Sequence, residues 1–377
     1  MTAFDFDALR RWPDVEADNL FAVDATDRLL LDEAREALAQ AAAGEVAVVG
    51  DRYGALTLGA AALFGATGLR VHQDPLSGEH ALVANAESFG LTGTYRSADL
   101  APALFTGARV VLLQLPRSLA ALDEIAGLIA RHAAPEVVVF AGGRIKHMTP
   151  AMTDVLQRHF ARVAASLARQ KSRVLRAEQP VAADSPSTDA WPRREFHADL
   201  GLWVAAHGAA FAGTGVDIGT RFLLQFLPQM KPDATSAIDL GCGTGLLAAA
   251  LAASRPALSV LATDQSAVAV ASARATMAAN DLTERVTVVR DDALASRPDA
   301  SAELIMLNPP FHIGASVHAG IALKLFEDAA RVLRPGGELW TVWNSHLGYR
   351  PALDRIVGPT QQAGRNAKFT VTVSRKG

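Results

Sequence analysis

Short apolar runs alternate with longer segments rich in alanine and leucine along the second half of the chain. The short runs predict strands and the longer segments predict helices. The predicted strands lie at 237–239, 258–263, 286–289, 304–307 and 338–343, and the predicted helices lie at 221–227, 246–253, 267–280 and 319–333. This alternation predicts an α/β fold in which helices cover both faces of a parallel sheet. Arg334–Gly337 predicts a turn, and the run at 369–374 predicts a late antiparallel strand.

The first half of the chain repeats this alternation. Predicted strands at 45–50, 69–73, 109–115 and 136–140 are interspersed with predicted helices at 22–43, 55–64, 119–132 and 151–171. Gly50–Gly54 stands where the second half has a glycine-rich loop, and Asp74 follows the next strand much as Asp264 does. We therefore predict one fold in two copies, the first of which has lost its ligand loop. The alternative is that α/β domains in general look alike at this level.

A chain of 377 residues is long for one domain and fits two. A stretch rich in proline, serine and aspartate separates the halves and is typical of a linker. We predict a first domain at 1–176, a linker at 177–190 and a second domain at 191–377. The first domain is expected to dock the substrate or to support the folding of the second.

Composition and charge exclude several classes of protein. The formal net charge of −3 argues against a polybasic nucleic-acid binder, so any contact with RNA needs a local basic patch. Cys242 is the single cysteine, which excludes a disulfide framework and a cysteine-ligated zinc or iron–sulfur site, and we expect no metal. The first 18 residues lack the apolar core of a signal peptide, and no apolar run has the length of a membrane span. We therefore expect a soluble cytoplasmic protein.

The segment Ala237-Ile-Asp-Leu-Gly-Cys-Gly-Thr-Gly245 joins a predicted strand to a predicted helix. Its glycines, Gly241, Gly243 and Gly245, allow a tight turn and a close approach of the backbone to a ligand. The helix start that follows offers unpaired N–H groups. The loop therefore suits a nucleotide-like ligand that carries a carboxylate.

Polar side chains follow four of the predicted strands, and parallel strands bind ligands beyond their carboxyl ends. These residues are Asp239, Asp264, Asp292 and Asn308. Asp239 is expected to hold the glycine loop and an amino group of the ligand, Asp264 to accept both ribose hydroxyls, and Asp292 to accept an adenine N–H. The same spacing would also suit a nicotinamide dinucleotide, and Asp264 alone could cap a helix instead.

Asn308-Pro-Pro-Phe311 ends the fourth predicted strand of the second half. Methyl transfer to an exocyclic amine needs the nitrogen lone pair aimed at the methyl group more than it needs a base. The Asn308 side-chain oxygen and the Pro309 carbonyl can hold an NH₂ group, Pro310 stiffens the turn, and Phe311 can stack on a base. A glycine loop followed by this motif resembles class I S-adenosylmethionine-dependent N-methyltransferases. A base in a duplex must then be flipped out or already unpaired.

Three further segments narrow the resemblance: Phe211–Thr220, Asn308–His312 and Trp343–Tyr349. With them the chain resembles the RsmC/RlmG family of bacterial ribosomal RNA guanine-N2 methyltransferases over nearly its whole length. The resemblance implies two tandem Rossmann-like class I methyltransferase domains, the N-terminal copy degenerate, with S-adenosyl-L-methionine as cofactor and ribosomal RNA or a ribosomal subunit as partner. Segments 115–119 and 143–147 favour the RlmG branch, which modifies large-subunit RNA.

The resemblance also implies roles for particular residues. Phe211, Gly215 and Asp217 belong to the loop that closes over the cofactor, and Asn308 borders both cofactor and substrate. The residues expected on the substrate side are His312, Asn344, Arg350, Arg365 and Lys368. The chain departs from the family pattern where Trp343 replaces an alanine and where Gly358-Pro-Thr replaces a Phe-Gly.

We therefore expect transfer of a methyl group to the N2 of a guanine in ribosomal RNA, with large-subunit RNA favoured slightly. An adenine N6 or a protein glutamine amide would use the same motif, so these acceptors remain alternatives. A non-catalytic RNA-binding assembly factor is an alternative of another class, against which the intact acids argue. A nicotinamide oxidoreductase would have no use for Asn-Pro-Pro-Phe, and Cys242 has no base beside it that would make it a nucleophile.

Overall fold

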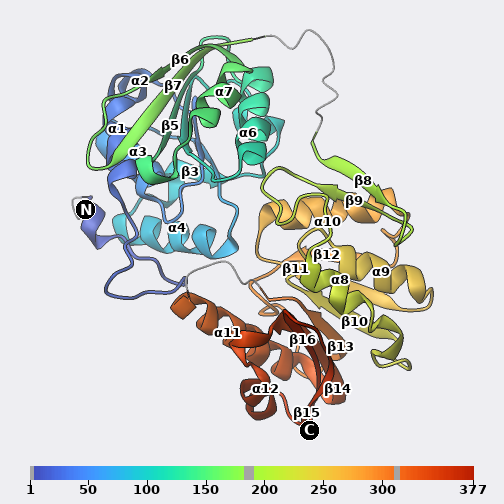
Figure 1. The fold of residues 1–377 in the computed structure, drawn as a ribbon. Helices are drawn as coiled ribbons and strands as arrows, with labels where there is room; N and C mark the ends of the chain where they lie inside the picture. Colours follow the sequence, from blue (N-terminus) through green and yellow to red (C-terminus); the bar gives the residue numbers. More distant parts are fainter. Residues whose placement is uncertain (1–3, 182–190, 310–314) are drawn as a thin grey trace. The chain divides into compact units, whose positions relative to one another are not determined.

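The computed structural model describes residues 4–181, 191–309 and 315–377, the last range without the side chains of residues 315–319. The chain divides into two compact units, Met1–Trp191 and Pro192–Gly377 (Figure 1). Each unit contains one seven-stranded mixed sheet. The segment predicted as a linker begins later than 177, because residues 177–180 form the end of a strand that pairs on both sides.

The sheet of the second unit has the strand order β12-β11-β10-β13-β14-β16-β15. Its first five strands are parallel, and β16 runs antiparallel to β14 and β15. The strands are β10 (Ser236–Leu240), β11 (Ser259–Asp264), β12 (Val286–Arg290), β13 (Ala302–Leu307), β14 (Leu333–Asn344), β15 (Thr360–Arg365) and β16 (Phe369–Arg375). The order reverses between β10 and β13, and sheets of this kind bind ligands beyond such a switch point.

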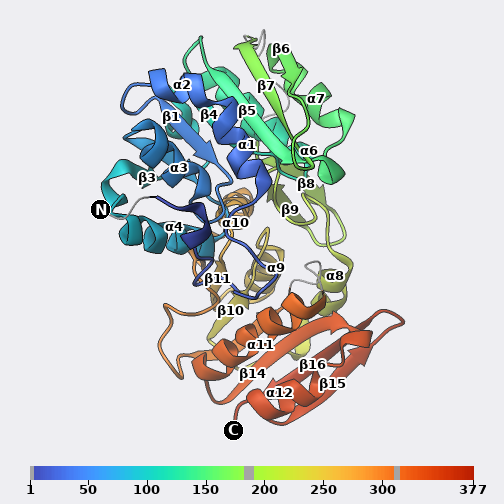
Figure 2. The same cartoon turned by 90° about the vertical axis from the view of Figure 1, so that its left-hand side faces the viewer.

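Helices cover both faces of this sheet because its strands are apolar on both sides. Leu304 and Met306 of β13 enter one core, whereas Ile305 and Leu307 enter the other. The first core includes side chains of α8 (Ile218–Leu224), α9 (Leu246–Ser254) and α10 (Ala267–Ala279). The second core includes side chains of α11 (Ala315–Val332) and α12 (Arg350–Ile356), which lie together over one face of the sheet (Figure 2).

The first unit has the same topology. Its strand order is β3-β2-β1-β4-β5-β7-β6, which is the order of the second unit strand for strand. The strands are β1 (Val46–Val49), β2 (Leu69–His72), β3 (Tyr95–Ser97), β4 (Val110–Gln114), β5 (Val138–Arg144), β6 (Phe160–Ala165) and β7 (Ser172–Pro180). The helices are α1 (Ala25–Glu33), α2 (Arg35–Gln40), α3 (Ala55–Phe64), α4 (Leu76–Phe89), α5 (Pro102–Phe105), α6 (Leu119–His132) and α7 (Pro150–Gln157). The predicted tandem of two Rossmann-like domains is confirmed.

Three predicted elements were wrong. The helix expected at 151–171 ends at Gln157, and the rest forms β6 and the turn before β7. Most side chains of β6 are exposed, as expected of a strand at the sheet edge, and Gln170 and Lys171 turn the chain with φ of 47° and 61°. The helix expected at 22–43 is two helices, of which α1 starts at the Asp24 capping box. The turn expected at Arg334–Gly337 lies within β14, where Gly336 and Gly337 form backbone hydrogen bonds with Lys376.

A hairpin that the sequence did not predict precedes the second sheet. It consists of β8 (Arg193–His197) and β9 (Leu202–Ala206), which pair antiparallel. The side chains of Thr276 and Asn280 on α10 form hydrogen bonds with the backbone of Ala205 and Trp203 on β9. The hairpin therefore packs on the helix that follows β11.

Candidate active site

The glycine loop begins where β10 ends and is tied to the neighbouring strand β11. The backbone N–H groups of Gly241 and Cys242 both donate to the carbonyl of Thr263, at 2.8 and 2.9 Å. Gly241 and Gly243 have φ of +70° and +55°, and a Cβ atom at either position would meet no heavy atom within 4 Å. The loop thus turns in a conformation that favours glycine and presents open space on the side where a ligand would lie. Burial raises the pKa of the Cys242 thiol, which agrees with an unreactive loop residue.

Gly245, at the start of α9, is the one of the three loop glycines at which a side chain would meet neighbouring atoms. A Cβ atom there would lie 2.9 Å from Met277 Cε and 3.0 Å from Ala273 Cβ, and its φ is +78°. We expect Gly245→Ala to lower the free energy of unfolding by about 2–5 kcal/mol, the sum of left-handed strain and overpacking. Gly241→Ala is the matched control, because it introduces left-handed backbone strain without overpacking. We expect it to lower the free energy of unfolding by about 1–2 kcal/mol. Urea unfolding of both variants measures the difference, and equal losses would contradict the packing argument.

Asp239 lies within β10 and is almost fully buried. Its Oδ2 accepts a hydrogen bond of 3.0 Å from the Ala248 N–H on α9, whereas its Oδ1 is buried and has no partner among the described residues. Burial raises the pKa of Asp239 to about 7; the Ala248 hydrogen bond opposes this rise and the charge of Asp264 adds to it. A buried acceptor without a partner costs free energy, so a donor from a ligand would be favoured here.

The raised pKa of Asp239 predicts a pH dependence of stability. Between about pH 4 and pH 7 the folded protein holds a proton that the unfolded chain has released, so this carboxyl destabilises the fold as pH rises through that window. We expect Asp239→Asn to resist urea better than the wild type at pH 8, and by a clearly smaller margin at pH 5. The same difference at both pH values would contradict the raised pKa.

Asp264, at the end of β11, connects the glycine loop with the start of α10. Its Oδ2 accepts from the Gly243 N–H at 3.0 Å, and its Oδ1 accepts from the Ser266 N–H at 2.9 Å. The N-cap of α10 is the side chain of Ser266, which accepts from the Ala269 N–H. Asp264 is thus not itself the helix cap. A carboxylate oxygen can accept more than one hydrogen bond, so these contacts are compatible with binding of ribose hydroxyls.

Asp292 follows β12 and forms an ion pair with Lys324 of α11, with 2.5 Å between Oδ2 and Nζ. Its neighbour Asp291 is buried and accepts from the backbone and hydroxyl of Ser296. The predicted contact of Asp292 with an adenine therefore has to share the carboxylate with a lysine that the sequence did not indicate.

Asn308 directly follows β13, level with Gly241 on the neighbouring strand, because Leu307 pairs with Leu240. Its Nδ2 donates to Asp217 Oδ2 at 3.0 Å and to Thr220 Oγ1 at 2.9 Å. Its Oδ1 is buried and has no partner among the described residues. Pro309 is buried as well. Pro310, Phe311 and His312 lie outside the described residues.

Asp217 caps the short helix α8, and its Oδ2 accepts from the Thr220 N–H at 3.0 Å. The predicted role of Asp217 in closing over the cofactor is thus accompanied by a contact with Asn308 that the sequence did not indicate. Thr220 was also missed: an aspartate N-cap predicts where α8 begins but does not indicate that the hydroxyl of Thr220 contacts Asn308. Phe211 and Gly215 precede α8 in an exposed turn, in which the Gly215 N–H donates to the Ala212 carbonyl.

Three of the predicted substrate-side residues lie at the sheet edge that carries Asn308. Asn344 ends β14, and it pairs with Phe369, the first residue of β16. Arg365 ends β15 opposite Thr370, and Lys368 directly precedes β16. Arg350 begins α12, where its side chain lies 3.9 Å from Asp354. The Nζ of Lys368 lies 5.3 Å from the centre of the Phe369 ring, so a positive charge borders this edge.

The first unit has a loop of the same length that differs in chemistry. Gly50 and Gly54 have positive φ, and the Gly50 N–H donates to the His72 carbonyl as Gly241 donates to Thr263. By this correspondence Gln73 takes the place of Asp264. The sequence had suggested Asp74 as the counterpart of Asp264, which is one residue too far along the chain. The Gln73 amide donates to the Asp51 carbonyl. Arg52 stands where Gly243 does, and the first copy therefore lacks the acid and the middle glycine.

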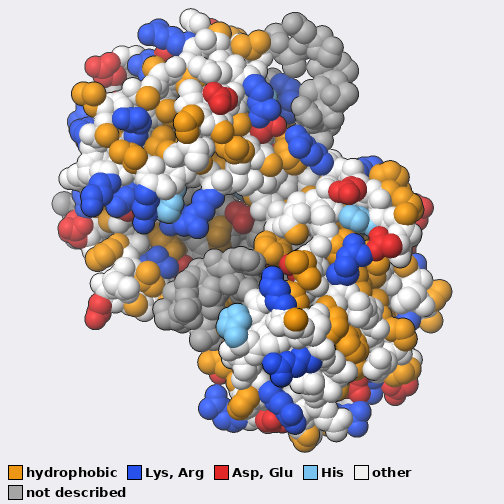
Figure 3. Space-filling view, viewed as in Figure 1, with side chains coloured by type: hydrophobic (Ala, Val, Ile, Leu, Met, Phe, Trp, Pro, Cys, Tyr) orange, Lys and Arg blue, Asp and Glu red, His pale blue; other side chains and the backbone are white. Residues whose placement is uncertain are grey.

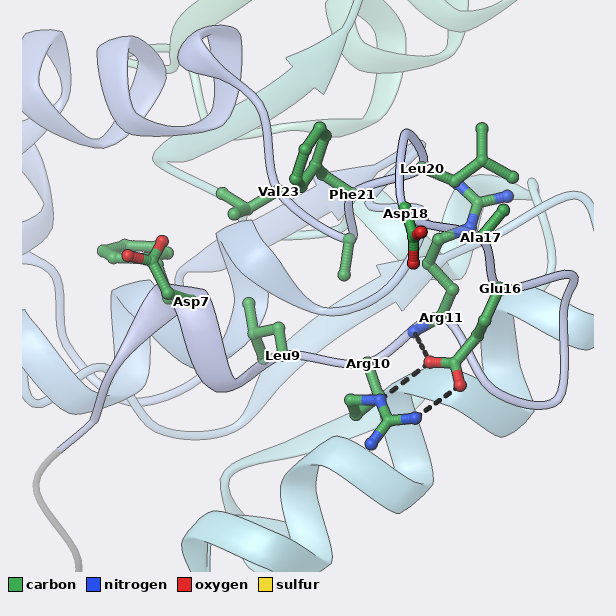
Figure 4. A pocket seen from close by; sticks show the side chains of 12 residues that line it. Asp7, Leu9, Arg10, Arg11, Glu16, Ala17, Asp18, Leu20, Phe21 and Val23 are labelled. Atoms are coloured by element: carbon green, nitrogen blue, oxygen red, sulfur yellow. Dashed lines mark hydrogen bonds and ion pairs between the residues drawn. The ribbon is translucent and has the colours of Figure 1, made fainter.

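Two pockets lie among the described residues of the first unit, and the one at its sheet edge is rich in positive charge. One pocket of about 340 Å³ lies beside Asp51 and is lined by four cationic side chains, Arg52, Arg117, Arg144 and Lys146, and by His147. On the face drawn in Figure 3, Lys and Arg side chains gather together with a histidine on this unit. A second pocket lies within residues 6–23, where the Arg10 guanidinium is paired with Glu16 (Figure 4). The Arg10 hydrogen bond lowers the pKa of Glu16 to about 2, and none of the predicted site residues lines this pocket.

Family models match both halves of the chain. A family model described as a methyltransferase small domain matches residues 201–373, and a model described as an RLMG N-terminal domain matches residues 1–181. Curated relatives of the chain include proteins named ribosomal RNA large subunit methyltransferase G. That of Streptomyces coelicolor is 35% identical, with 96% of each chain covered. That of Pseudomonas aeruginosa strain PAO1 is 36% identical, with 98% of this chain and 97% of the relative covered.

Among solved structures, the 16S rRNA N2 G1207 methyltransferase RsmC of T. thermophilus, in complex with AdoMet and guanosine, aligns with a TM-score of 0.73. It covers 94% of this chain and 92% of its own at 22% identity, a likeness that shows the fold. The fold and the glycine loop thus define a Rossmann-like methyltransferase. The chain belongs to the family of the ribosomal RNA large subunit methyltransferases G.

Two kinds of feature are absent from the described ranges. No helix in them is long and apolar enough to cross a bilayer. Within the same ranges, no group of three or more His, Cys, Asp or Glu side chains could hold a metal ion.

Proposed function

We propose that the protein transfers the methyl group of S-adenosyl-L-methionine to the exocyclic N2 of a guanine in ribosomal RNA of the large subunit, in the cytoplasm. The names of the full-length relatives support the large subunit. The likeness to RsmC, an N2 methyltransferase whose structure contains guanosine, supports the guanine N2. The observation that carries the proposal is the buried Oδ1 of Asn308, level with the glycine loop and without a partner among the described residues.

The residues present fit S-adenosyl-L-methionine. Gly241 and Gly243 leave open space above the backbone, Asp239 Oδ1 is an acceptor without a partner among the described residues, and Asp264 has lone pairs for ribose hydroxyls. Asp239 and the loop would hold the amino-acid end, and Asp264 the ribose. The bound cofactor supplies a methyl group on a sulfonium centre, which is electrophilic without help from a base.

The residues of this chain then position the amine that receives the methyl group. Asn308 Oδ1 and the Pro309 carbonyl are suited to accept the two N–H bonds of the N2 amine. Holding that amine in line with the methyl group replaces a bimolecular encounter by an oriented one, which is worth up to about 7–11 kcal/mol in model reactions. The amine proton leaves after transfer, so no strong base is required. Lys368 and Arg365, at the same sheet edge, provide positive charge for phosphates.

The experiment is transfer of labelled methyl to purified ribosomal RNA and to ribosomal subunits from a strain that lacks the protein. Nucleoside mass analysis should find N2-methylguanosine in large-subunit RNA and none in small-subunit RNA. N2-methylguanosine in small-subunit RNA would overturn the choice of subunit. N6-methyladenosine or labelled protein would overturn the acceptor, and a cofactor-binding protein without transfer to any acceptor would overturn the enzymatic proposal.

A further inference from the structure

The side-chain amide of Asn308 has two orientations, and only one of them serves the proposed reaction. With Oδ1 toward the substrate, the amide accepts the N–H of the target amine. With Nδ2 toward the substrate, it would present a donor to another donor. An amide can rotate between these states, and its orientation is fixed only by its hydrogen-bond partners.

Asp217 determines which of the two orientations the Asn308 amide adopts. A carboxylate accepts hydrogen bonds and does not donate them, so the atom that faces Asp217 Oδ2 at 3.0 Å must be the Asn308 nitrogen. The second N–H of the amide goes to Thr220 Oγ1 at 2.9 Å, so both amide protons have acceptors. A hydroxyl can accept or donate, and Thr220 alone would therefore not select an orientation.

The three side chains are tightly assembled and partly buried. A Cβ atom on Gly219, which directly precedes Thr220, would lie 3.0 Å from Asp217 Oδ2 and 3.4 Å from Asn308 Oδ1. The same atom would lie 3.3 Å from the Phe369 ring. The Thr220 backbone N–H also donates to the same carboxylate oxygen, at 3.0 Å, so Asp217 is held in place by its own helix.

We propose that Asp217, assisted by Thr220, is a positioning residue that fixes the Asn308 amide with its oxygen toward the substrate amine. This inference rests on the proposed function for the identity of that amine. Asp217 acts through Asn308 rather than on the reacting atoms. Its removal should therefore lower kcat at saturating cofactor, a loss that a role in closing over the cofactor would not by itself cause.

Four substitutions separate positioning from helix capping. Asp217→Asn keeps an oxygen for both Thr220 N–H and Asn308, so methyl transfer should stay within about threefold of wild type. Asp217→Ser keeps a good cap, and hence the melting temperature, but its shorter side chain does not reach Asn308; kcat should fall about 10- to 100-fold. Thr220→Ser retains the hydroxyl and should retain activity, whereas Thr220→Val should lose part of it.

A double-mutant cycle decides whether Asp217 acts through Asn308. In an Asn308→Ala background, Asp217→Ser should cause no further loss of kcat, because the amide it orients is gone. Additive losses, or a loss of cofactor affinity in Asp217→Ser without a loss of kcat, would overturn the proposal.

A second readout is independent of the substrate. In the full chain labelled with ¹⁵N in asparagine side chains, the Asn308 NH₂ protons should exchange with water at least about tenfold more slowly in wild type than in Asp217→Ser. Slow exchange in a wild type that methylates some other amine would refute the proposed acceptor and keep the orienting role. Equal exchange in both proteins would refute the orienting role itself, whatever the acceptor.

Discussion

Asn308→Ala is expected to lower kcat for methyl transfer about 100- to 1,000-fold, the loss seen when one preorganised polar contact to a reacting group is removed. The variant keeps β13 and the glycine loop, because the Asn308 side chain bonds only Asp217 and Thr220 among the described residues. Cofactor affinity should therefore change less than about threefold. Single-turnover transfer to large-subunit RNA and calorimetric titration with S-adenosyl-L-methionine measure the two quantities.

Asn308→Asp is the matched control because it preserves shape and changes one donor into an acceptor. Its carboxylate would face the carboxylate of Asp217, and two like charges at hydrogen-bond distance repel each other. We expect it to be as poor an enzyme as the alanine variant at neutral pH. Activity of Asn308→Ala within tenfold of wild type would show that the amine is held by other groups.

Asp264→Ala is expected to weaken the binding of S-adenosyl-L-methionine at least about 100-fold. The substitution removes the acceptor of the Gly243 and Ser266 N–H groups, so the loop and the start of α10 lose their common anchor. Hydrogen bonds to a charged group are worth about 1.5–3 kcal/mol each, and the proposed ribose contact is lost as well. Titration calorimetry measures the affinity, and an unchanged Kd would remove Asp264 from the cofactor site.

The first unit provides the control for this prediction. Gln73 holds the position of Asp264, so Gln73→Ala should leave the affinity for S-adenosyl-L-methionine unchanged and the stoichiometry at one per chain. Weaker binding in this variant, or two equivalents bound by the wild type, would show that the first copy has kept a cofactor site.

The sequence was most informative where local pattern and fold agree. The apolar runs predicted β10, β11 and β13, and the glycine pattern predicted the strand-to-helix loop, at the place where the second sheet reverses its strand order. The edge strand β6 escaped prediction because most of its side chains are exposed, so no apolar alternation marks it. The polar contacts between residues far apart in the sequence were not predicted either. Asp217 and Asn308 are 91 residues apart, and Lys324 and Asp292 are 32 apart, separations at which a single sequence carries no signal for pairing.

The last strand of each unit is made last yet lies inside the sheet. β7 pairs with β5 and β6, and β16 pairs with β14 and β15. In each unit two strands therefore lack a hydrogen-bonded neighbour until the last strand has been synthesised. During synthesis the first sheet can close once Pro180 has left the ribosome, whereas the second stays open until Arg375 emerges. Until then β14 and β15 expose unpaired backbone, which is a hazard for association between nascent chains. The same exposure applies to β5 and β6 until β7 is made, so each half of the protein is expected to need protection until its own last strand emerges.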